Sequence, residues 1–374
     1  MTVQTPALIL DIEKLRANAA RMRNAVTRQG AVLRPHVKTT KSIDVARVLL
    51  DDGPPAITVS TLREAEFFLS HGLRDQIYGV GITPNKLDRV FALREQGADL
   101  KIILDNVEAA QAVAAACRMR GARVPVLIEV DSDGHRGGVR PDQVDQLVAI
   151  ADTLGRDADL RGVLTHAGGS YDARSEAELR AYARMERDGA VAAATRLRET
   201  GRRLDIVSIG STPTALFAED LSGITEVRAG VYGFFDLVMA GIGVCDPSDI
   251  AISVLSSVIA VQRDKRQFLI DAGWMALSRD RGTSAHPIDQ GYGLVCDLRG
   301  YPYGDLIVAS ANQEHGVVRP RNASDAELPD LHVGDLVRIL PNHACATSAQ
   351  HGGYGLWDPQ SETIRGQWPR IQGW

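Results

Sequence analysis

The stretch DLKIILDNVEAAQAVAAACRMRGARVPVLIEVD, residues 99 to 131, contains a complete strand–helix–strand unit. DLKIILD and VPVLIEVD are short runs rich in Val, Ile and Leu, which is typical of parallel strands that are covered on both faces. NVEAAQAVAAACRMRG lies between them as a helical stretch and ends in a glycine that can form a C-terminal cap. This stretch therefore predicts two parallel strands joined by a helix.

The same alternation continues on both sides of this unit. Eight such runs, each followed by a helical stretch, fill residues 31 to about 240, and this layout predicts a (β/α)8 barrel. The predicted strands are AVLRPHV (31–37), AITVS (56–60), QIYGV (76–80), DLKIILD (99–105), VPVLIEVD (124–131), LRGVLTH (160–166), DIVSIG (205–210) and TEVRAG (225–230).

A second, mainly β domain is predicted after about residue 240, where the pattern changes. ISVLSSVIAVQ, RQFLIDAG, DLIVASA and DLVRILP are strand-like, but the loops between them are long and no strong helix appears. TPALILD (5–11) precedes the first helix without a barrel partner, so we expect it to join the β domain. The predicted α/β protein thus has a barrel at residues 11–240 and a β domain made of residues 1–10 and 241–374.

Composition excludes several classes of function. The 374 residues carry a net charge of -5, and the pI near 6.0 gives no reason to expect nucleic acid or an anionic membrane as a partner. No apolar run reaches the roughly 18 residues that span a bilayer, and MTVQTPALILD lacks a basic leader region, so we expect a cytoplasmic protein. The four cysteines are widely spaced and show no pattern of a disulfide scaffold.

A lysine follows the first predicted barrel strand, at the end where such barrels build their active sites. RPHVKTTKS (34–42) places His36 and Lys38 on one face of the strand. A lysine that is partly shielded from water near other cations has a lowered pKa, and its free amine can form a Schiff base. The alternative is an ordinary surface lysine.

The seventh and eighth predicted strands end in small and hydroxylated residues. SIGSTPT (208–214) and RAGVY (228–232) are expected to offer free backbone N–H groups, and Ser211 and Thr212 add hydroxyl groups. Phosphate binding is the functional interpretation, and a tight turn is the alternative. A lysine and a phosphate site in one barrel mouth together indicate pyridoxal 5'-phosphate.

Three further segments carry groups with catalytic chemistry. PNHACAT (341–347) is expected to be extended, so His343 and Cys345 would share one side and bind one cation, with zinc favoured over Mn²⁺ or another divalent ion. Such a site would keep open positions for water or substrate. After the fifth and sixth strands, Arg136 could hold an oxyanion and His166 could stack on a flat ring, although a buried structural histidine is the alternative.

Together these segments resemble the fold-type III pyridoxal-phosphate enzymes and, within them, the D-threonine aldolase and D-serine dehydratase-like family, from TPALILD to the C-terminal His-x-Cys. The resemblance implies that Lys38 forms the Schiff base, that Arg136 holds the ring hydroxyl oxygen and that His166 stacks on the cofactor. It also implies a cofactor contact for Tyr171, a phosphate site at Gly210, Ser211, Thr212, Gly230 and Val231, and a divalent metal (Zn²⁺, with Mn²⁺ or Mg²⁺ as alternatives) on His343 and Cys345. Arg228 lies where an arginine pairs the ring nitrogen in related alanine racemases, although family members differ here.

The implied activity is that of a lyase which acts on a small D-configured β-hydroxy amino acid. The foremost reaction is dehydration of D-threo-3-hydroxyaspartate to oxaloacetate and ammonia, in which Lys38 removes the Cα proton and the metal assists loss of the β-hydroxyl. Retro-aldol cleavage to glycine and an aldehyde, and dehydration of D-serine, are close alternatives. A cofactor-binding protein without turnover and a metal-dependent hydrolase are alternatives of other classes.

Two features of this hypothesis concern residues and partners outside the cofactor site. Arg279 and Arg281 are candidates for binding a second substrate carboxylate, and solvated loop arginines are the alternative. The resemblance also implies a homodimer.

Overall fold

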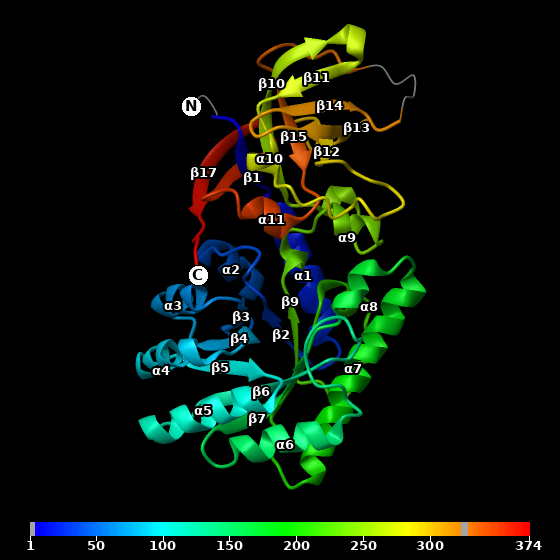
Figure 1. The fold of residues 1–374 in the computed structure, drawn as a ribbon. Coiled ribbons are helices and arrows are strands. Elements are labelled where there is room, and N and C mark those ends of the chain that lie inside the picture. The colour runs from blue at the N-terminus through cyan, green and yellow to red at the C-terminus, as the bar shows by residue number, and fades with distance from the viewer. Residues whose placement is uncertain (1–3, 323–327) are drawn as a thin grey trace. The chain divides into compact units, whose positions relative to one another are not determined.

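The computed structural model describes residues 4–322 and 328–374, and Figure 1 shows the order of the elements along the chain. The chain forms two compact units. The barrel unit comprises Ala20–Lys38, Leu49–Gly230 and Gly373–Trp374. The β unit comprises Met1–Ala19, Thr39–Val48 and Val231–Gln372.

Eight parallel strands form the sheet of the barrel unit, and the predicted (β/α)8 architecture is confirmed. Their spatial order is β2-β9-β8-β7-β6-β5-β4-β3. The sheet nearly closes on itself, because His36 forms an isolated parallel bridge with Thr58 and the Val37 N–H donates to the Thr58 carbonyl at 3.0 Å. The strands are β2 (Val32–Pro35), β3 (Ala56–Val59), β4 (Asp75–Gly81), β5 (Asp99–Leu104), β6 (Pro125–Val130), β7 (Asp159–Thr165), β8 (Ile206–Ile209) and β9 (Glu226–Ala229).

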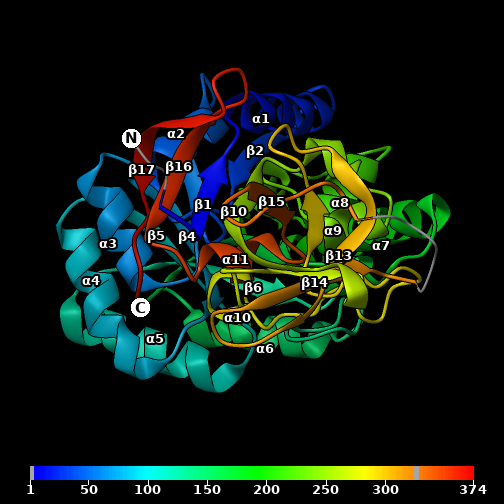
Figure 2. The same cartoon turned by 90° about the horizontal axis from the view of Figure 1, so that it is seen from above.

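Helices follow the strands, and Figure 2 shows α3 to α7 around the outside of the sheet. The predicted helix in NVEAAQAVAAACRMRG is confirmed, since the Asn106 side chain caps its start and Gly121, with φ 61°, closes its end. Helices α1 (Ile12–Thr27) and α2 (Ile43–Leu50) have residues in both units. The others are α3 (Leu62–Ser70), α4 (Leu87–Glu95), α5 (Val107–Arg120), α6 (Val144–Leu154), α7 (Glu176–Glu199) and α8 (Thr212–Phe217), with the 3-10 helices η1 (Pro84–Lys86) and η2 (Gly168–Asp172).

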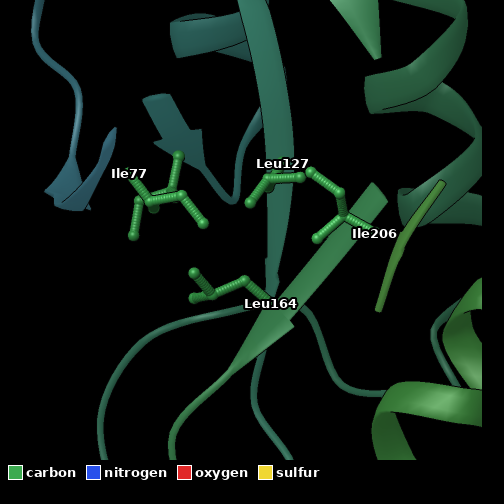
Figure 3. Close-up of a cluster of buried hydrophobic side chains, with 5 residues drawn as sticks. Ile77, Leu127, Leu164 and Ile206 are labelled. Atoms are coloured by element: carbon green, nitrogen blue, oxygen red, sulfur yellow. The ribbon is translucent and has the colours of Figure 1, made fainter. Parts of the chain in front are cut away.

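An apolar core holds the barrel strands together. One buried side chain from each of five successive strands joins a single cluster, which is shown in Figure 3; its members are Ile77, Ile103, Leu127, Leu164 and Ile206. Burial of one such side chain stabilises the fold by about 1.5–3 kcal/mol relative to exposure. The residues that follow these strands are therefore carried on a rigid frame.

The β unit contains one nine-stranded sheet in the order β11-β14-β13-β12-β15-β10-β1-β16-β17. The N-terminal strand β1 lies between β10, which is antiparallel to it, and β16, which is parallel, so its predicted place in the β domain is confirmed. The strands are β1 (Ala7–Leu10), β10 (Ile252–Gln262), β11 (Gln267–Ile270), β12 (Leu294–Cys296), β13 (Pro302–Ala311), β14 (Gly316–Pro320), β15 (Leu336–Leu340), β16 (Gly353–Asp358) and β17 (Thr363–Pro369).

The helices that begin within the β unit's C-terminal segment are short, as the sequence predicts. They are α9 (Leu237–Gly241), α10 (Trp274–Leu277) and α11 (Ala344–Ser348), with the 3-10 helices η3 (Val231–Gly233), η4 (Pro247–Asp249) and η5 (Arg263–Lys265). Helix α11 corrects one prediction, because PNHACAT is not extended throughout. His343 has extended backbone (φ -134°, ψ 107°), but Cys345 already lies in the first turn of the helix.

The described part of the chain contains neither a disulfide nor a membrane-spanning helix. None of the four cysteines, all of which lie in that part, forms a disulfide. No helix within residues 4–322 and 328–374 is long and apolar enough to cross a membrane.

Candidate active site

His36 and Lys38 lie at the end of β2 in the barrel unit. The His36 ring donates from Nδ1 to the Thr58 carbonyl at 3.0 Å, which holds it at the closing seam of the barrel. Burial, together with the charges of Lys38 and Arg228, holds the pKa of His36 well below its ordinary value, so the ring is neutral. Lys38 follows in a turn and is exposed, whereas the sequence predicted a partly shielded lysine. The charge of its amine acts to lower the pKa of both His36 and His166.

His166 follows β7 and is fixed by the loop after β8. Its Nδ1–H donates to the Gly210 carbonyl at 2.6 Å, because a carbonyl oxygen can only accept. Burial lowers the pKa of His166 to about 3, with further lowering from Lys38, Arg136 and Arg228. The ring is therefore neutral at physiological pH, and Nε2 carries its lone pair.

Arg228, in β9, is buried, and its guanidinium group is held by two hydrogen bonds that it donates. Nη1 donates to Ser208 Oγ and Nη2 to the Thr165 carbonyl, both at 2.7 Å. Burial lowers the pKa of Arg228 to about 10, while the nearby carboxylates Glu226 and Glu186 act to raise it. Arg228 thus remains a cation at neutral pH.

The loop after β8 differs from the prediction in its hydrogen bonds. The N–H groups of Gly210 and Ser211 are not free: the first donates to Glu186 at 3.0 Å and the second to Thr214 Oγ1 at 3.2 Å. The hydroxyl of Thr212, by contrast, is buried and has no hydrogen-bond partner among residues 4–322 and 328–374. Gly210 has φ +150°, and a Cβ there would lie 1.9 Å from the Arg228 carbonyl oxygen, so only glycine fits.

Ser211 is bound on two sides within the barrel unit. Its hydroxyl lies 2.9 Å from Thr214 Oγ1 and 3.0 Å from the Ser170 hydroxyl, which belongs to η2. These contacts fix the loop after β8 against the loop after β7.

Arg136 and Tyr171 lie on the loops after β6 and β7. Arg136 is exposed, and its charge acts to lower the pKa of both Glu129 and His166. Tyr171 is half-buried in η2, with its ring centroid 6.2 Å from that of His166. Asp133 joins the two loops, because it accepts from the Gly169 N–H at 2.8 Å.

The last two residues of the predicted phosphate site lie at the boundary between the units. Gly230 follows β9 and ends the barrel unit's main segment, whereas Val231 begins η3 of the β unit. Both residues are buried.

The predicted metal ligands lie together in the β unit. The His343 ring donates from Nδ1 to Asp280 Oδ2 at 2.6 Å, and the His343 and Cys345 side chains are hydrogen bonded to each other. Burial alone would lower the pKa of His343, but these two hydrogen bonds, together with the charges of Cys345 and Asp236, raise the pKa to about 11. The Cys345 thiol also lies 3.1 Å from Thr39 Oγ1.

A buried carboxylate, that of Asp236, fixes the backbone between His343 and Cys345. Asp236 accepts from the Ala344 N–H, between the two candidate ligands, at 2.8 Å and from the Met239 N–H at 2.9 Å. Burial raises the pKa of Asp236. No group of three or more His, Cys, Asp or Glu side chains in the described residues is placed to hold a metal ion, so this arrangement offers fewer than three protein ligands of these types.

The two candidate arginines have different surroundings. Arg281 forms an ion pair with Asp289 at 2.6 Å and lies over the Tyr292 ring. Arg279 is exposed, lies 5.1 Å from the Trp274 ring centroid, and forms no ion pair with the described residues.

The structure brings the predicted residues together in two groups. The barrel unit contains nine of them: Lys38, Arg136, His166, Tyr171, Gly210, Ser211, Thr212, Arg228 and Gly230. The β unit contains Val231, His343 and Cys345. Sequence reasoning missed Glu186 and Asp280. Asp280 lies in the polar stretch DAGWMALSRDRGT, but nothing in the sequence connects it to a histidine 63 positions away.

Comparison with known proteins places this geometry in a family. The model described as "Alanine racemase, N-terminal domain" matches residues 10–237, and the "Putative serine dehydratase domain" matches residues 251–356. The D-threo-3-hydroxyaspartate dehydratase of Delftia sp. (strain HT23) is 49% identical, over 100% of this chain and 99% of its own. The D-serine dehydratase of Dictyostelium discoideum is 27% identical (97% and 95% covered), and the 3-hydroxy-D-aspartate aldolase of Paracoccus denitrificans (strain Pd 1222) is 26% identical (98% and 91%).

Two solved structures of D-threo-3-hydroxyaspartate dehydratase mutants are similar over the whole chain. A cysteine-to-alanine mutant in the metal-free form has a TM-score of 0.97 at 48% identity, covering 100% of this chain and 99% of that one. A histidine-to-alanine mutant has the same TM-score and identity, covering 100% and 96%. The two mutated positions are two residues apart in that enzyme, as His343 and Cys345 are here.

Proposed function

Since the chain belongs to the alanine racemase N-terminal domain family and carries a serine dehydratase domain after it, we propose that it is a pyridoxal-phosphate- and metal-dependent dehydratase of D-configured β-hydroxy amino acids. Its foremost substrate is D-threo-3-hydroxyaspartate, which yields oxaloacetate and ammonia. The observation that carries the proposal is the full-length match to the Delftia dehydratase, at nearly twice the identity of the aldolase and D-serine dehydratase relatives.

The barrel unit has the chemistry that pyridoxal phosphate requires. The unpartnered, buried Thr212 hydroxyl is a donor in need of an acceptor, and a phosphate oxygen would supply one. His166 is neutral and fixed, as a ring that stacks on an aromatic cofactor should be, and the charges of Lys38, Arg136 and Arg228 lower its pKa. These features fit an anionic, flat ligand.

Each residue then has a defined role toward the cofactor. Lys38 would hold the aldehyde, Arg136 the ring hydroxyl oxygen, and His166 one ring face, with Tyr171 and Arg228 nearby. The phosphate would be held by Gly210, Ser211, Thr212, Gly230 and Val231. When bound, the cofactor supplies an electron sink for charge that develops at the substrate Cα. The Lys38 amine is the base that removes the Cα proton, and the neutral His166 does not compete for it.

His343 and Cys345 would hold the divalent ion. Asp280 accepts from His343 Nδ1, so His343 would bind the ion through Nε2 after releasing the proton on that atom. An imidazole with a thiolate is a donor pair that favours zinc over Mn²⁺ or Mg²⁺. Two protein ligands leave open positions for substrate. The ion supplies a Lewis acid for the β-hydroxyl, which is otherwise a poor leaving group.

Several expectations from the sequence belong to the same proposal. The cofactor barrel would span residues 11–240, and residues 1–10 with 241–374 would form the domain that carries the metal ligands. The homodimer and the cytoplasmic location also remain proposals, to be tested by sedimentation and by cell fractionation.

The decisive experiment is an assay of products from three substrates. D-threo-3-hydroxyaspartate should give oxo acid and ammonia, D-serine should react more slowly, and D-threonine should give no glycine. Treatment with EDTA should abolish turnover while the cofactor absorbance persists. If the hydroxyaspartate gives glycine, the reaction is retro-aldol cleavage and not dehydration. A protein that contains no cofactor would contradict the proposal altogether.

A further inference from the structure

A fully buried carboxylate lies where the loops after β7 and β8 meet. Glu186, in the middle of α7, has 0% of its surface exposed. Its Oε1 atom accepts from the Ala167 N–H at 2.8 Å and from the Gly210 N–H at 3.0 Å. Its Oε2 atom accepts from the Thr214 hydroxyl at 2.6 Å. These three donors come from the loop after β7, the loop after β8 and the first turn of α8, and none comes from α7 itself.

These contacts close a ring of hydrogen bonds around His166. Ala167 is the next residue along the chain, and its N–H shares Glu186 Oε1 with the N–H of Gly210. The Gly210 carbonyl in turn accepts from His166 Nδ1 at 2.6 Å. One carboxylate oxygen therefore sets the distance between the His166 backbone and the peptide that orients the His166 ring.

The second carboxylate oxygen acts on the start of α8, which directly follows the loop after β8. The Thr214 hydroxyl, which donates to Oε2, also accepts from the Ser211 N–H at 3.2 Å and lies 2.9 Å from the Ser211 hydroxyl. Thr212 lies between these two residues in the sequence, and its buried hydroxyl has no hydrogen-bond partner within the described residues. Glu186 thus holds the backbone from which Thr212 extends.

Stability of the fold is a poor reason to bury this group. Moving a carboxylate out of water costs several kcal/mol unless it is hydrogen bonded, and burial raises the pKa of Glu186. An apolar side chain could fill the same space in α7, but it would leave two buried N–H groups unpaired. The buried carboxylate of Glu186 is best explained by its hydrogen bonds to the loops after β7 and β8, which it holds in place.

We propose that Glu186 is a positioning residue that sets both the phosphate-binding loop after β8 and the ring of His166 for the cofactor. This inference rests on the proposed function, because it presumes pyridoxal phosphate in the barrel unit. Glu186 does not contact the cofactor in this account. It acts through Gly210, Thr214 and Ala167.

The test compares binding of pyridoxal phosphate with binding of pyridoxal, which lacks the phosphate. Both ligands are titrated into the full-length apoprotein and followed by absorbance. Glu186→Ala should raise the Kd of pyridoxal phosphate at least tenfold. It should raise the Kd of pyridoxal by a smaller factor, because pyridoxal depends on the His166 ring but not on the phosphate-binding loop. Glu186→Gln keeps an oxygen acceptor for the two N–H groups and should stay within about threefold of wild type for both ligands.

A second buried carboxylate provides a matched control. Glu64, in α3, is also fully buried, and it accepts from the Ser60 N–H at 2.9 Å and from the Thr61 hydroxyl at 3.3 Å, next to the start of its own helix. Glu64→Ala should lower the melting temperature without a phosphate-specific loss of affinity. If Glu186→Ala does not fold, Thr214→Val removes the link from Oε2 to Ser211 and should show the same selective loss to a smaller extent.

The outcomes separate this inference from the proposed function. Equal losses for the two ligands, an unchanged Kd in Glu186→Ala, or the same selective loss in Glu64→Ala would overturn the role of Glu186. Failure of the wild-type apoprotein to bind pyridoxal phosphate would overturn the proposed function itself.

Discussion

His166 Nδ1 lies 2.6 Å from the carbonyl oxygen of Gly210, so the histidine after β7 is oriented by the first residue of the loop after β8. Because the carbonyl can only accept, the proton is on Nδ1 and the Nε2 lone pair faces away from this bond. The N–H of the same residue, Gly210, donates to Glu186. Ring orientation and loop position are thus coupled in the barrel unit.

The neutral state of His166 predicts a pH-dependent stability. Its pKa of about 3 in the folded protein lies below the ordinary value near 6.5, so the unfolded chain binds more protons between these values. The free energy of unfolding should therefore fall as pH falls through this window. From about pH 7 to 5.5, urea unfolding of the apoprotein should show a loss about 1 kcal/mol larger in wild type than in His166→Gln.

Glutamine retains an N–H that can reach the Gly210 carbonyl, so this variant removes the titration and keeps the contact. His36 contributes in the same direction, since its pKa is also lowered, but it is present in both proteins and cancels. Identical pH dependence in the two proteins would show that His166 is not held neutral.

Thr212→Val should separate cofactor binding from folding. The Thr212 hydroxyl has no hydrogen-bond partner in the part of the chain that the structure describes, so its removal should leave the stability of the apoprotein unchanged or slightly raised. A hydrogen bond to a charged group contributes about 1.5–3 kcal/mol, so the Kd for pyridoxal phosphate should rise roughly 10- to 100-fold. Thr212→Ser is the control and should bind normally. A valine variant with wild-type affinity would remove Thr212 from the phosphate site.

Asp280→Asn should weaken metal binding without affecting the cofactor. The carboxylate orients His343 and makes its ring a better ligand, and loss of such a partner typically costs 10- to 100-fold in metal affinity. Zinc affinity, measured by competition with a chromophoric chelator, should fall by that factor while the cofactor absorbance is retained. Asp289→Asn, which alters the same region through Arg281, should leave zinc affinity unchanged. Equal affinities in all three proteins would argue against a role for Asp280.

Arg279→Ala should affect the substrate with two carboxylates more than the substrate with one. Arg279 forms no ion pair in the described residues, whereas the Arg281 guanidinium is bound to Asp289. We expect the KM for D-threo-3-hydroxyaspartate to rise about tenfold, equivalent to about 1.4 kcal/mol, and the KM for D-serine to change little. Proportional changes for both substrates would contradict a role in reading the second carboxylate.

The barrel could be predicted because its signal is local and repeated. Strands such as β3 (AITV) and β8 (IVSI) are buried at every position, and the helix at Val107–Arg120 has its cap residues at both ends. The β unit was predicted less completely. Strand β17 alternates between exposed and half-buried positions, and β12 has only three residues, so neither resembles a buried run.

The site residues that were missed act over long distances in the sequence. Glu186 sits among charged residues of an amphipathic helix, where a glutamate normally faces solvent, and only the fold brings it to Gly210. Cys345 was placed in an extended segment because His-x-Cys has period two, but the backbone turns into α11 directly after His343. The two side chains still meet, since a residue at the start of a helix can contact the residue that precedes its first turn.

Borohydride reduction of the cofactor-loaded protein, followed by peptide mapping, tests the central claim most directly. If Lys38 holds the pyridoxal phosphate aldehyde, the label should be found on Lys38, in the peptide that contains RPHVKTTKS, and should be absent from Lys38→Ala. A stable label on Lys41 or on any other lysine would contradict this account.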